Sequence, residues 1–320
     1  MGFLSSLFSS SKKEDTSSEE KPKEDLKNFD ILKYDGIRAM QMRQVSYAIK
    51  CFQKALEIQP DFETMSHLIS AYTMADESES ALDVVDQMII MEPEDVNSLL
   101  ARVNILFHLD RDNEVVPTCD KAIELEPENY VAWFLRAKAK RAINKPTEAI
   151  DDVTRAIEIK EDFANGYLLR SEIYLSVEDG EKALEDVDKV ISLVEDGEEA
   201  AHLLRGRIYE LLGNNETAAN EYREVLELNP FKEEAYLLAG RLLTNQQKYD
   251  EAMAIYDEAI EHVESFANAY AMRGKLKELT GDMQGAEDDL KIAAELAPEE
   301  DNEEKIGQAD FDNLYKGGIF

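Results

Sequence analysis

The sequence predicts an all-α fold built from helical hairpins in tandem, and three observations predict it. Units of 33 to 35 residues follow one another eight times, small side chains return at fixed places within them, and a proline closes most units. A unit of this length holds two helices and two short turns. Counted from two residues before an apolar or aromatic anchor, the units begin at Phe29, Phe62, Val96, Tyr130, Ala164, Glu199, Glu233 and Ala267.

The places that repeat are those that a close pair of helices needs. The eighth place of a unit holds glycine, alanine or serine in six units, and the twentieth place holds alanine in seven. Small side chains let two helices approach closely. The third unit departs, because Val115 takes the twentieth place and Pro117 falls early in the second helix, so a local distortion is expected there. The prolines that close units are Pro60, Pro93, Pro127, Pro230 and Pro298.

Together these places resemble the tetratricopeptide repeat, with about eight repeats over residues 29–300. The resemblance implies a right-handed superhelical solenoid whose concave groove is lined by the first helix of each hairpin. A single hairpin cannot bury its apolar face alone, so each depends on its neighbours. The expected domains are a disordered N-terminal tether over residues 1–28, the solenoid over 29–300, and a C-terminal capping helix with a free tail over 301–320.

An arginine occupies the seventh place of units four, five, six and eight, where an apolar side chain would be expected. The same four units carry an acid at the twenty-third place, and only the third unit has the arginine, Arg102, without the acid. Since an unpaired, partly buried charge is costly, the pattern predicts ion pairs between the two helices of one hairpin. The predicted pairs are Arg136 with Asp152, Arg170 with Asp186, Arg205 with Glu221, and Arg273 with Asp289.

Composition excludes several classes of function. The chain has 69 acidic and 35 basic residues, and its formal net charge of −34 repels nucleic acid, so no nucleic-acid partner is expected.

Cys51 and Cys119 lack metal or redox spacing and are expected to be packed thiols. Free thiols suit a reducing compartment, and no segment has the length of apolar sequence that a bilayer span needs. A cytoplasmic location is therefore predicted.

The first residues allow weak contact with a membrane as an alternative to a plain disordered leader. Phe3, Leu4, Leu7 and Phe8 would share one face of a helix. So short a face predicts no stable membrane insertion and at most reversible peripheral contact.

No catalytic motif is present, and neither enzymatic activity nor a cofactor is expected. The sequence has no phosphate-binding glycine loop, nucleophile elbow, calcium loop or zinc-binding helix motif. His67 and His108 would lie in adjacent hairpins, but no third ligand accompanies them in the pattern. A metal-dependent enzyme is the most distant alternative.

The repeats instead predict a protein-interaction scaffold or adaptor that binds an acidic and apolar peptide segment in the groove. Four of five residues at the ninth place of units four to eight are basic, which departs from the acidic background. The alternative is a solvated stripe that balances neighbouring acids. The predicted basic contacts are Lys138, Arg141, Arg207, Arg241 and Lys275, and the predicted apolar contacts are Phe134, Leu168, Leu203 and Leu237.

Three other roles stay open. A co-chaperone resembling those relatives that grip a C-terminal carboxylate would need a fixed set of Lys, Asn and Arg, of which Lys33 alone matches. A self-associating structural component would join copies through the ends of the array. The tail over residues 307–320, with acids alternating with aromatic and apolar residues, could occupy the groove itself. The four mismatched places of the carboxylate set are Ile37, His67, Asn97 and Ala101.

Overall fold

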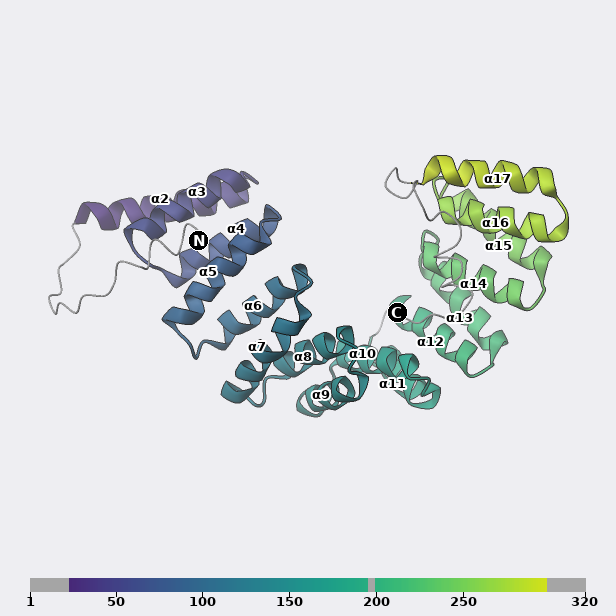
Figure 1. Cartoon of the computed structure of the whole chain (residues 1–320), viewed down its shortest axis with the longest axis horizontal. Coiled ribbons are helices and arrows are strands. Elements are labelled where there is room, and N and C mark those ends of the chain that lie inside the picture. The colour runs from purple at the N-terminus through teal and green to yellow at the C-terminus, as the bar shows by residue number, and fades with distance from the viewer. Residues whose placement is uncertain (1–22, 195–198, 298–320) are drawn as a thin grey trace. The chain divides into compact units, whose positions relative to one another are not determined.

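The computed structural model describes residues 23–194 and 199–297, and these residues form sixteen α-helices and no strand. The helices follow one another in hairpins (Figure 1). The predicted all-α fold of tandem hairpins is therefore confirmed. The chain divides into two compact units, an N-terminal unit that ends at Glu161 and a C-terminal unit that begins at Asp162.

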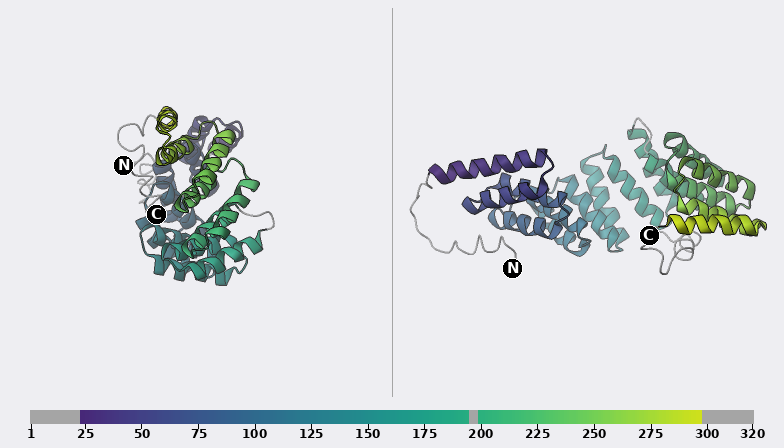
Figure 2. Two further views of the ribbon diagram at one scale, coloured as in Figure 1. Left: turned by 90° about the vertical axis from the view of Figure 1, so that its right-hand side faces the viewer. Right: turned by 90° about the horizontal axis from the view of Figure 1, so that it is seen from above.

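The N-terminal unit contains four hairpins, and each packs against the next in chain order (Figure 2). One apolar cluster runs through them and includes the fully buried Phe52, Leu68 and Leu106. The hairpins are α2 (Lys23–Gln41) with α3 (Val45–Ile58), α4 (Phe62–Met74) with α5 (Ser78–Met91), α6 (Val96–His108) with α7 (Asp112–Leu125), and α8 (Tyr130–Ala142) with α9 (Pro146–Ile159).

The C-terminal unit repeats the arrangement with four further hairpins. Its apolar clusters form where the second helix of one hairpin meets the first helix of the next, as at Tyr222 and Tyr236. The hairpins are α10 (Ala164–Ser176) with α11 (Gly180–Leu193), α12 (Glu199–Leu211) with α13 (Asn215–Leu228), α14 (Glu233–Asn245) with α15 (Tyr249–His262), and α16 (Ala267–Thr280) with α17 (Met283–Leu296).

The predicted close approach of the two helices is present where the eighth place is glycine. Gly206 on α12 faces the fully buried ring of Tyr222 on α13, and a Cβ at residue 206 would overlap that ring. Gly240 stands in the same relation to Tyr256. The missing side chain is thus the space into which an aromatic ring of the second helix packs.

The first helices of hairpins two to eight begin at the predicted unit starts, but α2 begins at Lys23, before Phe29. Residues 23–28, assigned to the disordered tether from their polar composition, therefore form the first turns of α2. These polar residues are helical because extending an existing helix needs no new nucleus, and Lys, Glu and Leu are good helix formers. The rest of the tether, with Phe3, Leu4, Leu7 and Phe8, and the cap and tail at 301–320 lie outside the described residues.

The distortion expected in the third hairpin does not shorten its second helix. Helix α7 has 14 residues, as α5 and α9 do, although Pro117 lies inside it. Val115 is fully buried at the place where the other second helices carry alanine. Pro117 is the sixth residue of α7, so it removes the hydrogen bond that an N–H there would donate to the carbonyl of residue 113, but the residues beyond it continue the helix.

The turn inside every hairpin depends on one residue in the left-handed conformation, at the fifteenth place of the unit. After Glu178, with φ of 60°, the N–H of Asp179 donates to the carbonyl of Tyr174 at 2.9 Å and closes α10. Only two of the eight residues are glycine, so the sequence gives little sign of this turn. The residues are Arg43, Asp76, Asp110, Asn144, Glu178, Gly213, Gln247 and Gly281.

Replacing a left-handed residue by glycine should stabilise the chain. Gln247 has φ of 60°, a conformation that a side chain disfavours and glycine does not. We expect Gln247→Gly to raise the free energy of unfolding by about 1 kcal/mol, measured by urea denaturation. Gln246→Gly is the matched control, because residue 246 has φ of −80° and glycine there should destabilise. Equal effects of the two substitutions would contradict the assignment.

Candidate functional site

All four predicted arginine pairs form, with nitrogen-to-oxygen distances of 2.7 to 2.9 Å. Arg136, for example, donates from Nε and Nη2 to the two carboxylate oxygens of Asp152, which is almost fully buried. Such two-pronged hydrogen bonds fix the geometry as well as the charge. The interpretation of these arginines as structural is confirmed for Arg136 with Asp152, Arg170 with Asp186, Arg205 with Glu221, and Arg273 with Asp289.

A second acid, which the sequence reasoning missed, comes from the preceding hairpin. Arg136 Nη1 lies 2.6 Å from Asp120 on α7, and Arg273 Nη1 lies 2.7 Å from Asp257 on α15. The acid stands at the twenty-fifth place of the preceding unit, so the arginine joins two successive second helices. We call the space between these two second helices, in which the arginine side chain of the intervening first helix lies, the arginine slot. Arg102 crosses its slot between Asp86 and Thr118, and Arg205 between Asp188 and Glu221.

Two of the paired acids receive a lysine as a second cation: Lys140 Nζ lies 2.8 Å from Asp152, and Asp289 has the equivalent contact. Lys277 Nζ lies 2.8 Å from the Asp289 carboxylate, beside Arg273. Burial acts to raise the pKa of Asp289, but the hydrogen bonds from Arg273 and Lys277 lower it overall. At Asp186, whose hairpin has Tyr174 in place of the lysine, burial outweighs Arg170 and raises the pKa.

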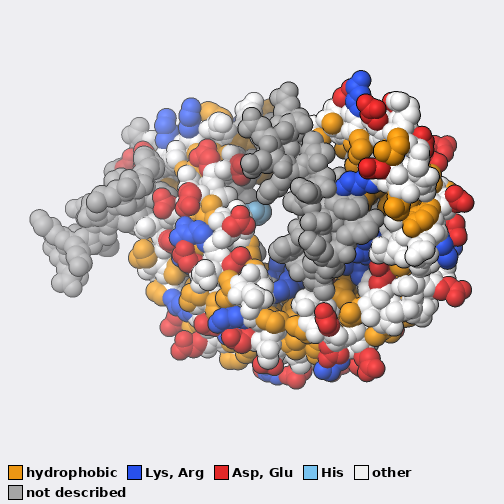
Figure 3. All heavy atoms as spheres, turned by 45° about the vertical axis from the view of Figure 1, so that its right-hand side comes forward, with side chains coloured by type: hydrophobic (Ala, Val, Ile, Leu, Met, Phe, Trp, Pro, Cys, Tyr) orange, Lys and Arg blue, Asp and Glu red, His pale blue; other side chains and the backbone are white. Residues whose placement is uncertain are grey.

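The basic residues predicted to bind a peptide lie on first helices, two of them in the N-terminal unit and three in the C-terminal unit. Lys138 and Arg141 belong to α8, and the Lys138 ammonium stands 4.9 Å from the ring centroid of Phe107. Arg207 on α12 is half-buried and makes no hydrogen bond or ion pair with any other described residue. Acidic side chains are scattered over the face drawn in Figure 3, among apolar and basic ones. Arg241 lies on α14 and Lys275 on α16.

Arg241 is held by a carboxylate that sequence reasoning did not identify. Its Nη2 lies 2.8 and 2.9 Å from the two oxygens of Glu210 on α12, and Tyr222 donates its hydroxyl to the same carboxylate. Burial, followed by the charge of Glu210, raises the pKa of Tyr222. An acid occurs at the twelfth place in only two units, Glu210 and Glu278, so the repeat pattern gave no sign of this contact.

The apolar candidates differ in exposure. Phe134, Leu168 and Leu237 are half-buried, because each packs one side against a core cluster. Leu203 is only 5% exposed and lies in the core. The prediction that Leu203 offers a contact surface therefore needs correction: Leu203 is buried in the apolar cluster that α12, α13 and α14 form, although the residues at the same place of the other three hairpins keep part of their surface open.

Residues behind the alternative roles have partners of their own. Lys33, the one match to the carboxylate-gripping set, lies 2.9 Å from Asp61 and 2.7 Å from Glu63. His67 stacks on Phe52 with ring centroids 5.6 Å apart. His108 ends α6. Among the described residues, no cluster of three His, Cys, Asp or Glu side chains could hold a metal ion.

Both cysteines are buried and free, as expected. Burial raises the pKa of the Cys119 thiol to about 12. In the part of the chain that the structure describes, no helix has the length and apolar content to cross a membrane.

A family model described as tetratricopeptide repeat matches residues 203–269 and 237–301, within the C-terminal unit. No curated protein matches the chain in sequence.

Solved structures resemble the chain across both units. A tetratricopeptide repeat protein from Parabacteroides merdae aligns with a TM-score of 0.61 at 18% identity and covers 79% of this chain and 97% of its own. The Cut9-Hcn1 hetero-tetramer of the APC/C aligns at 0.55 with 15% identity, over 90% of this chain and 55% of the other. PilW, a type IV pilus biogenesis factor, aligns at 0.55 with 17% identity, over 61% and 90%. At these identities the likeness shows the fold alone.

Breaking one arginine pair should destabilise the chain more than removing both partners. Arg170→Leu leaves the buried Asp186 carboxylate without its guanidinium, and we expect a loss of about 3 kcal/mol in the free energy of unfolding. Arg170→Leu with Asp186→Val copies Leu68 and Val84 of the second hairpin and should recover most of that loss. Urea denaturation measures both, and a double variant as unstable as the single one would contradict the pairing.

The lysine beside Asp289 should make stability depend on acid pH. Because the pKa of Asp289 is lower in the folded chain, its contribution is present at neutral pH and is lost as pH falls through that pKa. Lys277→Met should raise the pKa of Asp289 and reduce stability at neutral pH, and this difference should vanish once the carboxyl is protonated. NMR titration of the Asp289 carboxyl measures its pKa, and urea denaturation at neutral pH and at a pH below that pKa measures the difference in stability. A difference that persists in acid would point to packing by Lys277 instead.

Proposed function

Because the chain is a tetratricopeptide repeat protein, we propose that it serves as a non-catalytic scaffold or adaptor and binds a peptide segment of another protein on the first helices of its hairpins. The peptide carries carboxylates and a few apolar anchors. Extended and helical peptides both use such surfaces, and main-chain or helix geometry sets the spacing of their anchors.

Arg207 carries this proposal. The residue is half-buried on α12, and its guanidinium makes no hydrogen bond or ion pair with another described residue, so its five donors are available to an anion. The chain has a formal net charge of −34, so acids to neutralise Arg207 are abundant, yet none reaches it among the described residues. A partner's carboxylate supplies the missing contact.

The neighbours of Arg207 in the C-terminal unit suit the same ligand. Arg241 on α14 is held in one orientation by Glu210, and Lys275 follows on α16. Leu237 on α14 keeps part of its surface open beside them. A peptide that crosses these three first helices meets cations at helix-to-helix intervals with an apolar contact between them. In the N-terminal unit, Lys138 and Arg141 with Phe134 offer a shorter version of this chemistry.

Other features fit within the proposal. The buried free thiols of Cys51 and Cys119 support a reducing, cytoplasmic location. The ion pairs of Lys33 with Asp61 and Glu63 weigh against a co-chaperone that grips a C-terminal carboxylate, because its one matching lysine is occupied.

The self-associating alternative has one observation in its favour. Leu290, Ile292 and Leu296 on α17, the last described helix, are each 36 to 37% exposed. A second copy or the predicted cap at 301–320 could cover them. Light scattering over a range of concentrations separates a monomeric adaptor from a self-associating component.

Charge reversal at Arg207 should remove the partner. We expect affinity purification from the native cell with Arg207→Glu to lose a protein that the wild-type chain retains, and the binding of a purified segment of that protein to weaken by about tenfold or more. The cause is loss of a charge-assisted hydrogen bond, so raised salt should weaken wild-type binding as well.

Lys291→Glu is the matched control, since it reverses an exposed charge on α17 of the same unit. Retention of the same partners by wild type, Arg207→Glu and Lys291→Glu would place binding outside the first helices.

A further inference from the structure

The seventh hairpin lacks every charge of the arginine slot. Its seventh place is Ala239 on α14, and its twenty-third place is Ile255 on α15. At the twenty-fifth place of the preceding unit, where Asp86, Asp120, Asp188 and Asp257 serve other hairpins, the chain has Arg223 on α13. No side chain of this hairpin can therefore bridge α13 and α15 in the usual way.

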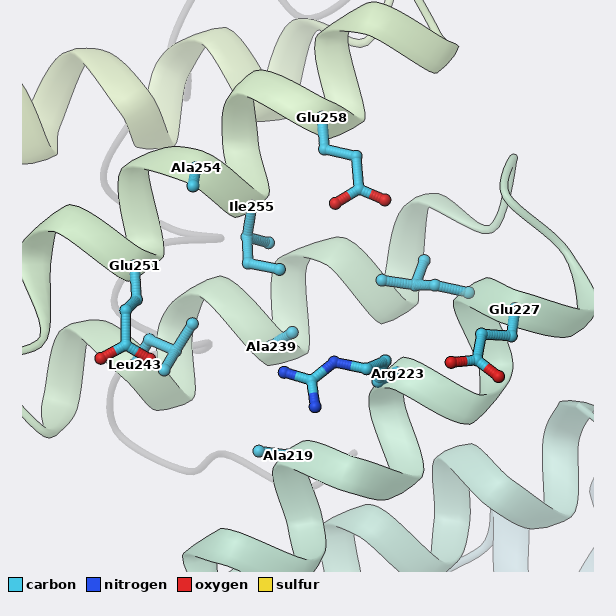
Figure 4. A pocket seen from close by; sticks show the side chains of 10 residues that line it. Ala219, Arg223, Glu227, Ala239, Leu243, Glu251, Ala254, Ile255 and Glu258 are labelled. Carbon is cyan, nitrogen blue, oxygen red and sulfur yellow. The ribbon is translucent and has the colours of Figure 1, made fainter.

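The second hairpin also lacks the arginine, but it fills the slot. Leu68 and Val84 are fully buried there, and Gln53 donates to the hydroxyl of Tyr72 at 2.7 Å. Alanine at residue 239 leaves much of the same space open. A pocket of about 460 Å³ lies between α13, α14 and α15 (Figure 4). Its apolar lining comes from Ala219, Leu226, Ala239, Leu243, Ala254 and Ile255.

The charges at the pocket are divided between its two walls. Arg223 belongs to α13, is exposed, and makes no hydrogen bond or ion pair with any other described residue. Glu251 and Glu258 belong to α15, and Glu227 lies one turn beyond Arg223 on α13 (Figure 4). The pocket thus offers one cation and one anion on the α13 wall and two anions on the α15 wall, around an apolar floor.

This pocket does not share a surface with the proposed peptide site. Ala239 and Leu243 lie one turn apart on α14, whereas Arg241 between them points to the other side, since two residues turn a helix by about 200°. The pocket opens between second helices, and Arg207, Arg241 and Lys275 lie on first helices.

We propose that the pocket is a second protein-binding site, for a partner segment that inserts one aliphatic or aromatic side chain between α13 and α15. The segment carries a carboxylate toward Arg223 and a basic side chain toward Glu251 and Glu258. The volume lies within the range of about 300 to 1,000 Å³ typical of pockets that bury a ligand. An apolar anchor in a pocket with complementary charges around it is the arrangement that gives protein interfaces affinity and orientation.

Charge complementarity favours this occupant over a uniformly acidic peptide. Glu227, Glu251 and Glu258 would repel additional carboxylates, while a segment with one acid and one base satisfies both walls. The occupant therefore differs in chemistry from the acidic peptide proposed for the first helices, and the two sites could hold different partners.

A variant that rebuilds the arginine slot tests the proposal. Arg223→Asp with Ala239→Arg and Ile255→Asp copies Asp257 of the seventh hairpin with Arg273 and Asp289 of the eighth, and should close the pocket with ion pairs. The single change Arg223→Glu alters only an exposed charge and serves if the triple variant does not fold. Lys291→Glu is the matched control, because Lys291 is an exposed base at the same twenty-fifth place.

The probe is a displayed library of random peptides, selected on the full-length wild-type chain, with affinities of the enriched peptides measured by fluorescence polarisation. We expect enriched peptides that combine one large apolar residue with an acid and a base. Their affinity should fall by about tenfold or more in Arg223→Glu and in the folded triple variant, and stay unchanged in Lys291→Glu and Arg207→Glu.

Several outcomes would overturn the proposal. One is the absence of enriched peptides; another is that every enriched peptide binds Arg223→Glu and the triple variant as well as it binds wild type. Wild-type dimers that the triple variant abolishes would assign the pocket to a second copy of the chain instead. If Arg207→Glu does not weaken partner binding, the proposed peptide site on the first helices is wrong, but the pocket proposal is unaffected. Arg207→Glu changes no residue that lines the pocket.

Discussion

Within each unit, stacking of one hairpin on the next is the constraint on which the rest of this structure depends. The helices are short, and the side chains at the faces between hairpins, such as Val85, Leu106 and Val187, are fully buried only because a neighbour covers them. The two helices within a hairpin can approach because glycine or alanine stands where an aromatic ring or backbone must fit, as at Gly206 and Tyr222.

The arginine slots add direction to this stacking. A hydrophobic face alone tolerates sliding, whereas Arg136 reaches Asp152 in its own hairpin and Asp120 in the preceding one, and so fixes three helices at once. Buried ion pairs contribute little net stability compared with apolar packing, and their value lies in specifying one arrangement. The arginine at the seventh place of a unit therefore stabilises the stacking of helices in the hairpins that carry it, and does not form a binding site there.

Where the scaffold charges are incomplete, surfaces for partners become available. Arg207 is a half-buried cation without a carboxylate among the described residues, and the seventh hairpin has an open slot in place of an arginine. These two departures lie on first and second helices respectively. A repeat array in which most units are alike can thus distinguish partners through the few units that differ.

The sequence by itself determined the hairpins, the starts of seven first helices, the four arginine pairs and the burial of both cysteines. The hairpins, the helix starts and the pairs follow from periodicity, since residues sixteen apart, such as Arg170 and Asp186, are brought together by a single turn, and the burial of the cysteines follows from their lack of metal or redox spacing. Only the tertiary structure decided the ion pairs of the arginines with the preceding hairpin, the burial of Leu203, the ion pair of Glu210 with Arg241 and the pocket at Ala239. These depend on the angle and distance at which one hairpin stacks on the next, which many side chains set jointly and no local pattern encodes.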